Sequence, residues 1–302
     1  MSDKSIFGRA SRPGTHRNDG TGRRFTFHVR PRPEIVSPLP ERHPAVVGGR
    51  TYFPKAVVEA EGAPRLLVSG ANSLKLGARV LKGRWRGAAI YHLTLEERAT
   101  CPRSCANWRT CYGNSMPVAR RHTHGPALER RLEEEVAQLA RRHRRGFIVR
   151  LHTLGDFYSV AYVALWARLL ARHSGLRVFG YTAWPRDSEI GAAVLALTNR
   201  SWARFAIRFS GAAPSAQGAT TIWFDPGPKK VPGAILCPTQ TGATACCATC
   251  GLCWASAARD KAIAFMGHGI VRRGARGHEP NLRDHLDDAV GLGQIPPAPR
   301  KP

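Results

Sequence analysis

The sequence predicts an α/β protein: a partial or irregular (β/α) barrel followed by a cysteine-rich, metal-binding C-terminal extension. Three observations support this prediction. Strand-like and helix-like segments alternate between residues 88 and 210. Predicted strands start near residues 147, 177 and 205, about 30 residues apart, which is the length of a βαβ unit. The eight cysteines fall into two closely spaced clusters, which indicates metal ligands before disulfides.

The first predicted unit consists of a strand, a loop, a helix and a second strand. Residues 88–95 are apolar, β-branched and aromatic, which is typical of a buried strand. Pro126 is suited to open a helix, because the first helical turn does not use the N–H that proline lacks. Apolar side chains recur at helical spacing until Gly146, and residues 147–153 form the second strand.

Two further helix–strand units follow. Residues 159–173 form a helix with one apolar side, and residues 177–182 form the third strand. Ser188 is a typical N-cap for a helix that runs through Trp202. Residues 205–210 form the fourth strand.

The regular alternation ends after residue 210. The short segments at 220–224 and 234–236 are too close together for full crossover helices, and residues 262–266 form the last strand. Because repeated βα units imply a parallel sheet with helices outside, an incomplete barrel fits this pattern best. An open, doubly wound sheet is the alternative.

The composition divides the chain into four regions. Residues 1–44 form a basic, disordered tail, and residues 45–236 form the partial barrel. Residues 237–283 hold the cysteine-rich metal-binding segment and the last strand, and residues 284–302 form a second disordered tail. The chain contains neither a membrane-length apolar run nor a secretory signal, so we expect a cytoplasmic protein without membrane attachment.

The formal net charge is +25, from 46 Lys and Arg against 21 Asp and Glu. Such a charge is typical of proteins that bind nucleic acid or another polyanion. Only eight of the cations are lysine, so 38 are arginine. A compositional bias toward arginine explains the same excess, and the sequence leaves both explanations open.

The first cysteine cluster, Cys101-x3-Cys105-x5-Cys111, supplies three thiolates on one loop. A zinc ion here would need a fourth ligand, for which His122 or His124 is available, or a water molecule. A [4Fe–4S] cluster held by three cysteines would instead leave one iron open for a substrate or cofactor. The spacing alone does not choose between the two metals.

Several polar residues are predicted to lie at the same edge of the sheet as this loop. The carboxyl ends of parallel strands form the binding site in α/β folds. Gly155 and Asp156 follow the second strand, Tyr181 ends the third, and Ser210 ends the fourth. Gly155 permits close approach of a ligand, and Asp156 offers an acceptor to an ammonium or hydroxyl group. The alternative for Asp156 is a helix cap.

The second cluster contains five cysteines. Cys247, Cys250 and Cys253 form a ferredoxin-like C-x2-C-x2-C run, and Cys237 is the natural fourth ligand. Cys246 is then spare, because adjacent cysteines seldom share one ion. These four thiols predict a second [4Fe–4S] cluster, with a structural zinc site as the alternative.

The order of strand, three-cysteine loop, helix, strand and Gly-acid turn resembles the radical S-adenosylmethionine enzymes. The resemblance implies a radical-SAM-type barrel in which Cys101, Cys105 and Cys111 hold a [4Fe–4S] cluster. It also implies that Gly155 and Asp156 bind the amino group of S-adenosylmethionine and that Ser210 approaches its ribose. The last cysteine gap is five residues where that superfamily usually has two, and the turn carries Asp where it usually has Glu.

A second resemblance covers roughly residues 66–268. Several blocks together are similar to an uncharacterised family of phage and bacterial gene products with a three-Cys motif. These blocks are GANSLKLG (70–77), TCP (100–102), CYGN (111–114), HTLGDF (152–157), GYT (180–182) and CGLCW (250–254). This resemblance supports the prediction of a functional site at these residues, and it implies no particular reaction.

The leading hypothesis is therefore an iron–sulfur protein that cleaves S-adenosylmethionine reductively and receives electrons from a donor protein. The competing hypothesis is a zinc-stabilised nucleic-acid-binding protein without catalytic activity, supported by the charge and by the knuckle-like cysteines.

Overall fold

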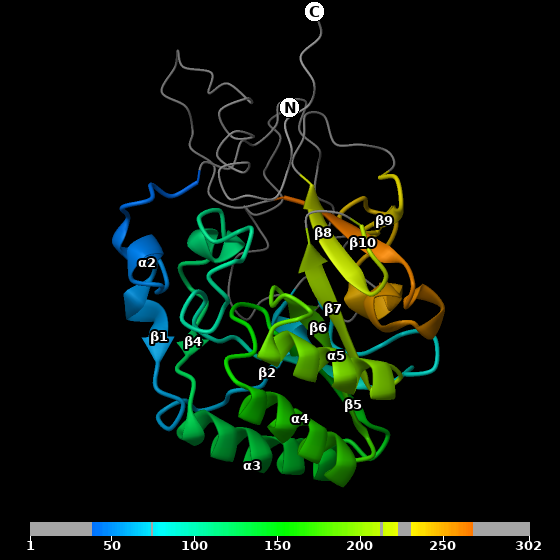
Figure 1. Cartoon of the computed structure of the whole chain (residues 1–302). Helices are drawn as coiled ribbons and strands as arrows, with labels where there is room; N and C mark the ends of the chain where they lie inside the picture. The colour runs from blue at the N-terminus through cyan, green and yellow to red at the C-terminus, as the bar shows by residue number, and fades with distance from the viewer. Residues whose placement is uncertain (1–37, 74, 212–213, 223–230, 268–302) are drawn as a thin grey trace, which may run out of the picture.

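The structure is a computed structural model that describes residues 38–73, 75–211, 214–222 and 231–267 (Figure 1). The predicted tail at 284–302 lies outside the described residues, as do residues 1–37 of the predicted N-terminal tail. No helix in the described part of the chain is long and apolar enough to cross a membrane.

The main sheet has eight strands in the spatial order β2-β3-β5-β6-β7-β8-β10-β9. Their bounds are β2 (Val68–Ser69), β3 (Ala89–His92), β5 (Phe147–Leu151), β6 (Leu176–Thr182), β7 (Phe205–Gly211), β8 (Gly218–Ile222), β9 (Ala234–Leu236) and β10 (Ala262–Met266). Strand β2 is antiparallel to β3, and every other neighbouring pair is parallel. Within the described residues β2 and β9 do not pair with each other, so the sheet is not closed.

Three helices cover one face of this sheet (Figure 1). They are α3 (Pro126–Arg142), α4 (Val160–Arg172) and α5 (Glu189–Ser201). Each begins where a local feature favours it. Pro126 lies in the first turn of α3. The side chains of Ser159 and Ser188 cap α4 and α5 by accepting the backbone N–H three residues later.

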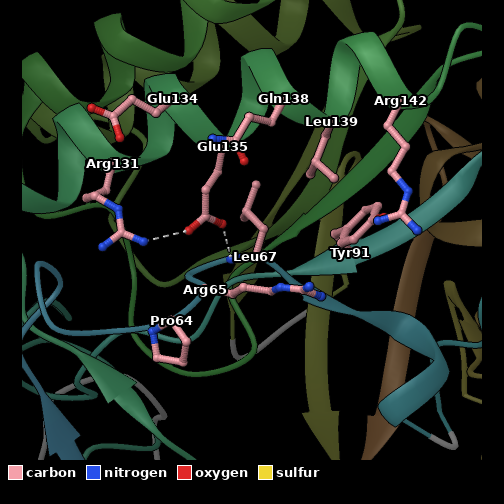
Figure 2. Close-up of a pocket in the computed structure, with 10 residues that line it drawn as sticks. All are labelled: Pro64, Arg65, Leu67, Tyr91, Arg131, Glu134, Glu135, Gln138, Leu139 and Arg142. Atoms are coloured by element: carbon pink, nitrogen blue, oxygen red, sulfur yellow. Dashed lines mark hydrogen bonds and ion pairs between the residues drawn. The ribbon is translucent and has the colours of Figure 1, made fainter.

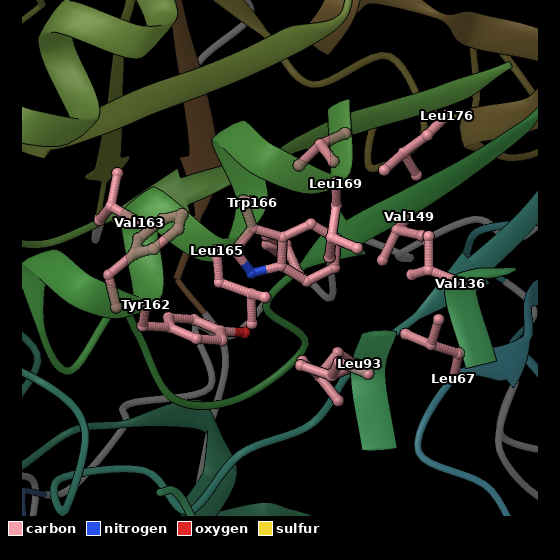
Figure 3. Packing of buried hydrophobic residues seen from close by; sticks show 14 of the residues in the cluster. Leu67, Leu93, Val136, Val149, Tyr162, Val163, Leu165, Trp166, Leu169 and Leu176 are labelled. Carbon is pink, nitrogen blue, oxygen red and sulfur yellow. The ribbon is translucent and has the colours of Figure 1, made fainter. Parts of the chain in front are cut away.

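The larger hydrophobic core lies between these helices and the sheet (Figure 3). Trp166 of α4 is fully buried among leucine and valine side chains from both layers. The core on this face includes Leu93, Leu132, Val136, Phe147, Val149, Leu169, Leu176, Val178, Val194 and Ile207. Burial of a side chain of this size stabilises the fold by roughly 1.5–3 kcal/mol, so this layer supports the sheet that positions the site.

The other face of the sheet is covered by the loop 75–88 and by the cysteine-rich segment 246–254. The ring of Trp254 stacks on that of Trp85 with centroids 5.8 Å apart, and it also packs against Phe179 at 4.5 Å. Two backbone hydrogen bonds, each 2.8–2.9 Å long, join residues 247 and 248 to residues 75 and 76. The cysteine-rich segment is therefore part of the core on this face.

This inner face changes character along the strands. Apolar side chains occupy its amino half: Ile90, Ile148, Phe179 and Ala206. Two residues further along each strand the same face carries polar side chains, because side chains alternate between faces. These polar residues are His92, Arg150, Tyr181 and Arg208. The cysteines lie near this polar half.

Short elements complete the described structure. They are α2 (Pro44–Val47), η1 (Pro54–Ala56), β1 (Val57–Val58), η2 (Gly70–Asn72), η3 (Tyr112–Ser115), β4 (Arg121–His122), α6 (Cys247–Cys250), η4 (Leu252–Trp254) and η5 (Ser256–Ala258). Strands β1 and β4 pair in parallel as a separate two-stranded sheet. Residues 38–44, which the composition assigns to the N-terminal tail, pack on the protein: Leu39 is buried, and its N–H donates to the carbonyl of Arg109.

The structure confirms a mixed α/β fold with a mostly parallel sheet. The described long helices all lie on one face, whereas a doubly wound sheet has helices on both, so that alternative does not fit the described part of the chain. The predicted last strand, residues 262–266, is strand β10 of the structure. Strand β10 lies between β8 and β9, so a segment late in the chain separates two earlier ones.

Candidate cysteine-rich site at the carboxyl edge of the sheet

The three-Cys loop, residues 101–111, follows β3, the first strand of the parallel series. The buried side chain of Arg98 stabilises the loop through hydrogen bonds. Its guanidinium donates to the carbonyl oxygen of Trp108 at 2.8 Å and to Oδ1 of Asn114 at 2.6 Å. Because Trp108 lies inside the loop and Asn114 just beyond it, this one side chain holds the loop against the segment that follows.

The thiols of the three-Cys loop lie together and are free of disulfides. Burial raises the pKa of Cys105 to about 12 and that of Cys111 to about 11, and it raises the pKa of Cys101 well above its usual range. Nearby negative charges raise these pKa values further: Asp156 and the other two thiolates act on Cys101, Cys111 acts on Cys105, and Glu97 acts on Cys111. A positively charged group is needed to hold these sulfurs as thiolates at neutral pH.

Gly155 packs directly against the start of the three-Cys loop. Its φ is +81°, in the left-handed region that favours glycine. A Cβ at this position would lie 2.6 Å from Oγ1 of Thr100 and 2.6 Å from Cβ of Leu95. The turn after β5 and the loop after β3 are therefore in close contact, as the sequence predicts for two carboxyl ends of neighbouring parallel strands.

A chain of hydrogen bonds joins the same two segments. The N–H of Asp156 donates to Oγ1 of Thr100 at 3.0 Å, and this hydroxyl donates to the carbonyl of Glu96 at 2.8 Å. Thr100 immediately precedes Cys101 in the chain. The position of Asp156 is thus coupled to the first cysteine through one side chain.

The carboxylate of Asp156 is buried and bridges two loops. Its Oδ1 accepts the N–H of Phe157 at 2.8 Å, and its Oδ2 accepts the N–H of Ala183 at 2.7 Å. Burial raises its pKa to about 7, although these hydrogen bonds act in the opposite direction. Asp156 does not cap α4, because Ser159 does. The helix-cap interpretation of Asp156 is therefore wrong.

Tyr181 and Ser210 lie at the same edge but in different surroundings. The hydroxyl of Tyr181 donates to Sγ of Cys253 at 2.8 Å, which places this tyrosine at the second cysteine cluster. Ser210 is exposed near the end of β7. The structure brings Gly155 and Asp156 to the three-Cys loop, whereas it places Tyr181 beside a different set of thiols.

The four-Cys group consists of Cys237, Cys247, Cys250 and Cys253. Cys237 lies just beyond β9, and the other three lie on α6 and η4. Burial raises the pKa values of Cys247, Cys250 and Cys253, the last to about 11. The charge of Cys237 raises all three further, so these four sulfurs lie close enough to interact.

Cys246 has a separate structural position. It is fully buried in the core formed with Trp85 and Trp254. It is the N-cap residue of α6, and its N–H donates to Oγ1 of Thr249 at 3.0 Å. Cys246 therefore has a packing and capping role in this core, and its exclusion from the four-thiol set stays a prediction.

Arg150 lies between the two sets of cysteines. It is close enough to interact electrostatically with Tyr112, next to Cys111, and with the thiols of Cys247 and Cys253. Its Nε has no hydrogen-bond partner within the described structure. Lys75 lies close enough to interact with Cys237, Cys247 and Cys253, and burial, followed by the charge of Arg150, lowers its pKa. Two cations thus face this polar region.

Arg208 of β7 holds the four-Cys segment to the sheet. Its guanidinium donates to the carbonyl oxygens of Cys253 at 3.0 Å, Ala258 at 2.8 Å and Lys261 at 2.7 Å. Sequence reasoning missed Arg150 and Arg208. The available signal was an arginine inside each of two otherwise apolar strands, FIVRL and FAIRF, where a charged side chain needs a local reason.

The two histidines after the loop differ from each other. His122 is buried in β4 and is not exposed to solvent, and burial lowers its pKa to about 4. The cations that lower this pKa further are Arg120 and Arg131. His124 is exposed, and its ring packs against that of Tyr158 with centroids 4.9 Å apart.

The fit of the cysteines to a metal centre rests on donor chemistry. Sulfur donors from cysteine are the usual ligands of iron–sulfur clusters and of structural zinc. In the part of the chain that the structure describes, no three His, Cys, Asp or Glu side chains are placed so that they could hold a metal ion. A cubane cluster makes a different demand, because each cysteine binds a different iron.

Comparison with known proteins adds one finding. Residues 66–213 match the protein family described as Gene product 88. The match supports the resemblance to phage gene products. Within the chain, the Gene product 88 match spans the strands from β2 to β7, the three-Cys loop and the Gly155–Asp156 turn, and it ends before the four-Cys group. No curated protein and no solved structure matched the chain.

Proposed function

We propose that the protein is a radical-SAM-like iron–sulfur enzyme. In this proposal Cys101, Cys105 and Cys111 hold a [4Fe–4S] cluster that binds S-adenosylmethionine at its open iron. The observation that supports it best is the direct contact between the three-Cys loop and the Gly155–Asp156 turn. Both follow neighbouring parallel strands, and Thr100 links them.

The finer fold assignment belongs to the same proposal. We infer that the parallel series beginning at β3 is a partial barrel of radical-SAM type. The three long helices of the described structure all lie on the outer face of the series β3, β5, β6 and β7, which supports this assignment. The inner face then carries the polar side chains at its carboxyl half, where a barrel enzyme binds its ligands.

When bound, the cluster would supply the electron that cleaves S-adenosylmethionine, and the protein would position the reactants. Asp156 holds the loops after β5 and β6 at a fixed separation by accepting one N–H from each. The side chain of Thr182 is a third hydrogen-bond partner of this carboxylate. Because a carboxylate has about four acceptor sites, one remains for an ammonium group. Arg150 and Lys75 place positive charge near the thiolates, which favours their deprotonated form.

The four-Cys group is proposed to hold an auxiliary [4Fe–4S] cluster. Its sulfurs lie on a segment that packs on the inner face of the sheet, and Tyr181 donates a hydrogen bond to one of them. Hydrogen bonds to cluster sulfur ligands tune the reduction potential. A structural zinc ion at these four cysteines is the competing outcome.

The decisive experiment is anaerobic purification followed by a visible spectrum and by assays for iron, sulfide and zinc. We expect broad absorbance near 400 nm, a feature of iron–sulfur clusters generally, with iron and sulfide in equal amounts. Cys101→Ala is expected to lose about half of the iron, because it removes one of two clusters. Cys246→Ala is the matched control and should keep all of it. A colourless protein with stoichiometric zinc would contradict the proposal.

A second experiment tests the cofactor. S-adenosylmethionine added to the reduced protein should change the EPR spectrum of the cluster held by the three-Cys loop. Asp156→Asn should weaken this effect while retaining the iron, because the cysteines are unchanged. An unchanged spectrum in the iron-loaded protein would exclude cofactor binding and leave only the cluster assignment.

A further inference from the structure

Five arginines gather at the opposite edge of the sheet from the cysteines. They are Arg79, Arg141, Arg142, Arg144 and Arg145, and together we call them the arginine surface. With Gly87, His143 and Gly146 they line a hollow of about 530 Å³. The hollow lies where α3 ends and β5 begins, at the amino edge of the strands. No carboxylate lines it within the described structure.

The charge of the arginine surface is not neutralised by the protein. All five side chains belong to exposed residues, and none takes part in an ion pair recorded in the described residues. Arg141 and Arg142 complement the dipole of α3 at its C-terminus. Arg144 and Arg145 lie beyond the helix, and Arg79 comes from a different segment that bridges to Ala89. Helix capping therefore does not explain three of the five.

A neighbouring hollow of about 470 Å³ shares Arg142 with the first (Figure 2). It adds Arg65 and Arg131 to its lining. Glu134 and Glu135 also line it. The two oxygens of Glu135 accept the N–H groups of Leu66 and Leu67 at 2.8 and 2.9 Å, and Arg131 pairs with it. Most of the negative charge that Glu135 could offer to the arginine surface is therefore directed toward its own partners.

We propose that the arginine surface binds the sugar–phosphate backbone of a nucleic-acid duplex without reading its sequence. A guanidinium group can donate two parallel hydrogen bonds to one phosphate group. Five guanidinium groups around one hollow therefore attract a polyanion. Single-stranded nucleic acid is bound by stacking on aromatic side chains. Apart from the imidazole of His143, the hollow of the arginine surface has no ring on its wall, so backbone contact with a duplex is favoured. This inference is independent of the proposed chemistry at the cysteines.

The test uses the full chain, anaerobically purified, and a fluorescent duplex of about 30 mixed base pairs, with anisotropy measured at several salt concentrations. The variant R79Q/R144Q/R145Q removes the three arginines that helix capping does not explain. We expect roughly tenfold weaker binding at about 0.1 M salt. For this variant the plot of log K against log salt should become shallower, with a slope smaller in magnitude by about 2 to 3, because each phosphate contact contributes about 0.9.

The control R120Q/R130Q/R168Q removes the same charge from exposed arginines outside both hollows. It should bind within about twofold of the original protein, since none of these arginines lines either hollow. Equal weakening by the two variants would show that total charge, and not the arginine surface, attracts the duplex, and would overturn the proposal.

Two further measurements keep the test independent of folding. R79K/R144K/R145K retains the charge and should keep most of the affinity, whereas a loss equal to that of the glutamine variant would contradict a phosphate contact. Thermal unfolding and metal content of each variant should match those of the original protein. Tighter binding to a single strand than to the duplex, unchanged in the glutamine variant, would place nucleic-acid binding elsewhere on the chain.

Discussion

Folding changes the ionisation of Asp156 in a way that can be measured. Its pKa rises from 3.8 to about 7 because its carboxyl group is buried. The folded protein therefore binds a proton more tightly than the unfolded chain does. This contribution to stability is complete below pH 3.8 and is lost as the pH rises toward 7 and above. The carboxylate is retained at this cost because it accepts an N–H from each of two loops.

The first prediction concerns this pH dependence. The difference in free energy of unfolding between the original protein and Asp156→Asn should be larger at pH 5 than at pH 8. A shift of about three pKa units gives a change of roughly 2–3 kcal/mol over this range. Urea unfolding at the two pH values measures it. If the difference is the same at both, Asp156 does not titrate as its burial implies.

Gly155 supports a second prediction at the same scale. Gly155→Ala places a Cβ 2.6 Å from Thr100 and Leu95, at a φ of +81°. Gly83→Ala is the matched control, because Gly83 has a φ of +74° but nothing within 4 Å of the added carbon. We expect about 1 kcal/mol of destabilisation at Gly83 and a further 1–3 kcal/mol at Gly155. Similar melting temperatures for the two variants would contradict the close contact.

At the scale of elements, a buried ion pair stabilises the segment that follows the three-Cys loop. Arg121 of β4 pairs with Glu97 through an Nε–Oε2 distance of 2.7 Å, and both side chains are almost fully buried. The same guanidinium donates to the carbonyl of Gly113 in η3 at 3.0 Å. It thereby connects the segment before the loop to the segment after it.

The third prediction follows from this burial. Arg121→Met leaves the carboxylate of Glu97 buried without its partner, which should cost about 3–5 kcal/mol of unfolding free energy. Glu97→Gln combined with Arg121→Met should recover part of this loss. Arg130→Met breaks an exposed pair with Glu61 and should cost at most about 1 kcal/mol. Chemical denaturation of the three variants checks the order, and an equal cost for both arginines would contradict it.

Elements with strong local patterns could be predicted from the sequence. The prolines and serines that start α3, α4 and α5 act through nearby backbone groups, so their effect is visible in a short window. Strand β10 has the predicted bounds, yet its place between β8 and β9 depends on partners more than 25 residues away in the chain. The partners in the pairing of β1 with β4 are 64 residues apart in the chain, and each strand has only two residues.

The residues of the candidate site also divide into those that the sequence could predict and those that it could not. Cysteine spacing reveals both clusters, because ligands on one loop leave a local pattern. The roles of Arg150 and Arg208 depend on which face of the sheet they occupy and on what covers that face. Both depend on the cysteine-rich segment folding back over the strands, which no local pattern indicates.

At the scale of the whole molecule, the two edges of the sheet have opposite chemical character. The carboxyl edge carries buried thiols and Asp156, whereas the amino edge carries the arginine surface. The strands that separate these edges are packed on one face by helices and on the other by the cysteine-rich segment. Loss of that segment would expose Trp85 and Phe179 on the inner face.

The last prediction tests whether a metal centre holds this covering segment in place. If the four-Cys group binds a cluster or an ion, stripping the metal leaves the segment attached through Arg208, the stacked ring of Trp254 and the two backbone hydrogen bonds to residues 75 and 76. Hydrogen exchange should then rise in residues 237–258 and in the loop 75–88, which packs against them. Exchange in α3 and α4 should stay slow, because their core lies on the other face. Cys253→Ser should reproduce the pattern without a chelator. Unchanged exchange in residues 237–258 after metal loss would show that packing alone holds the segment.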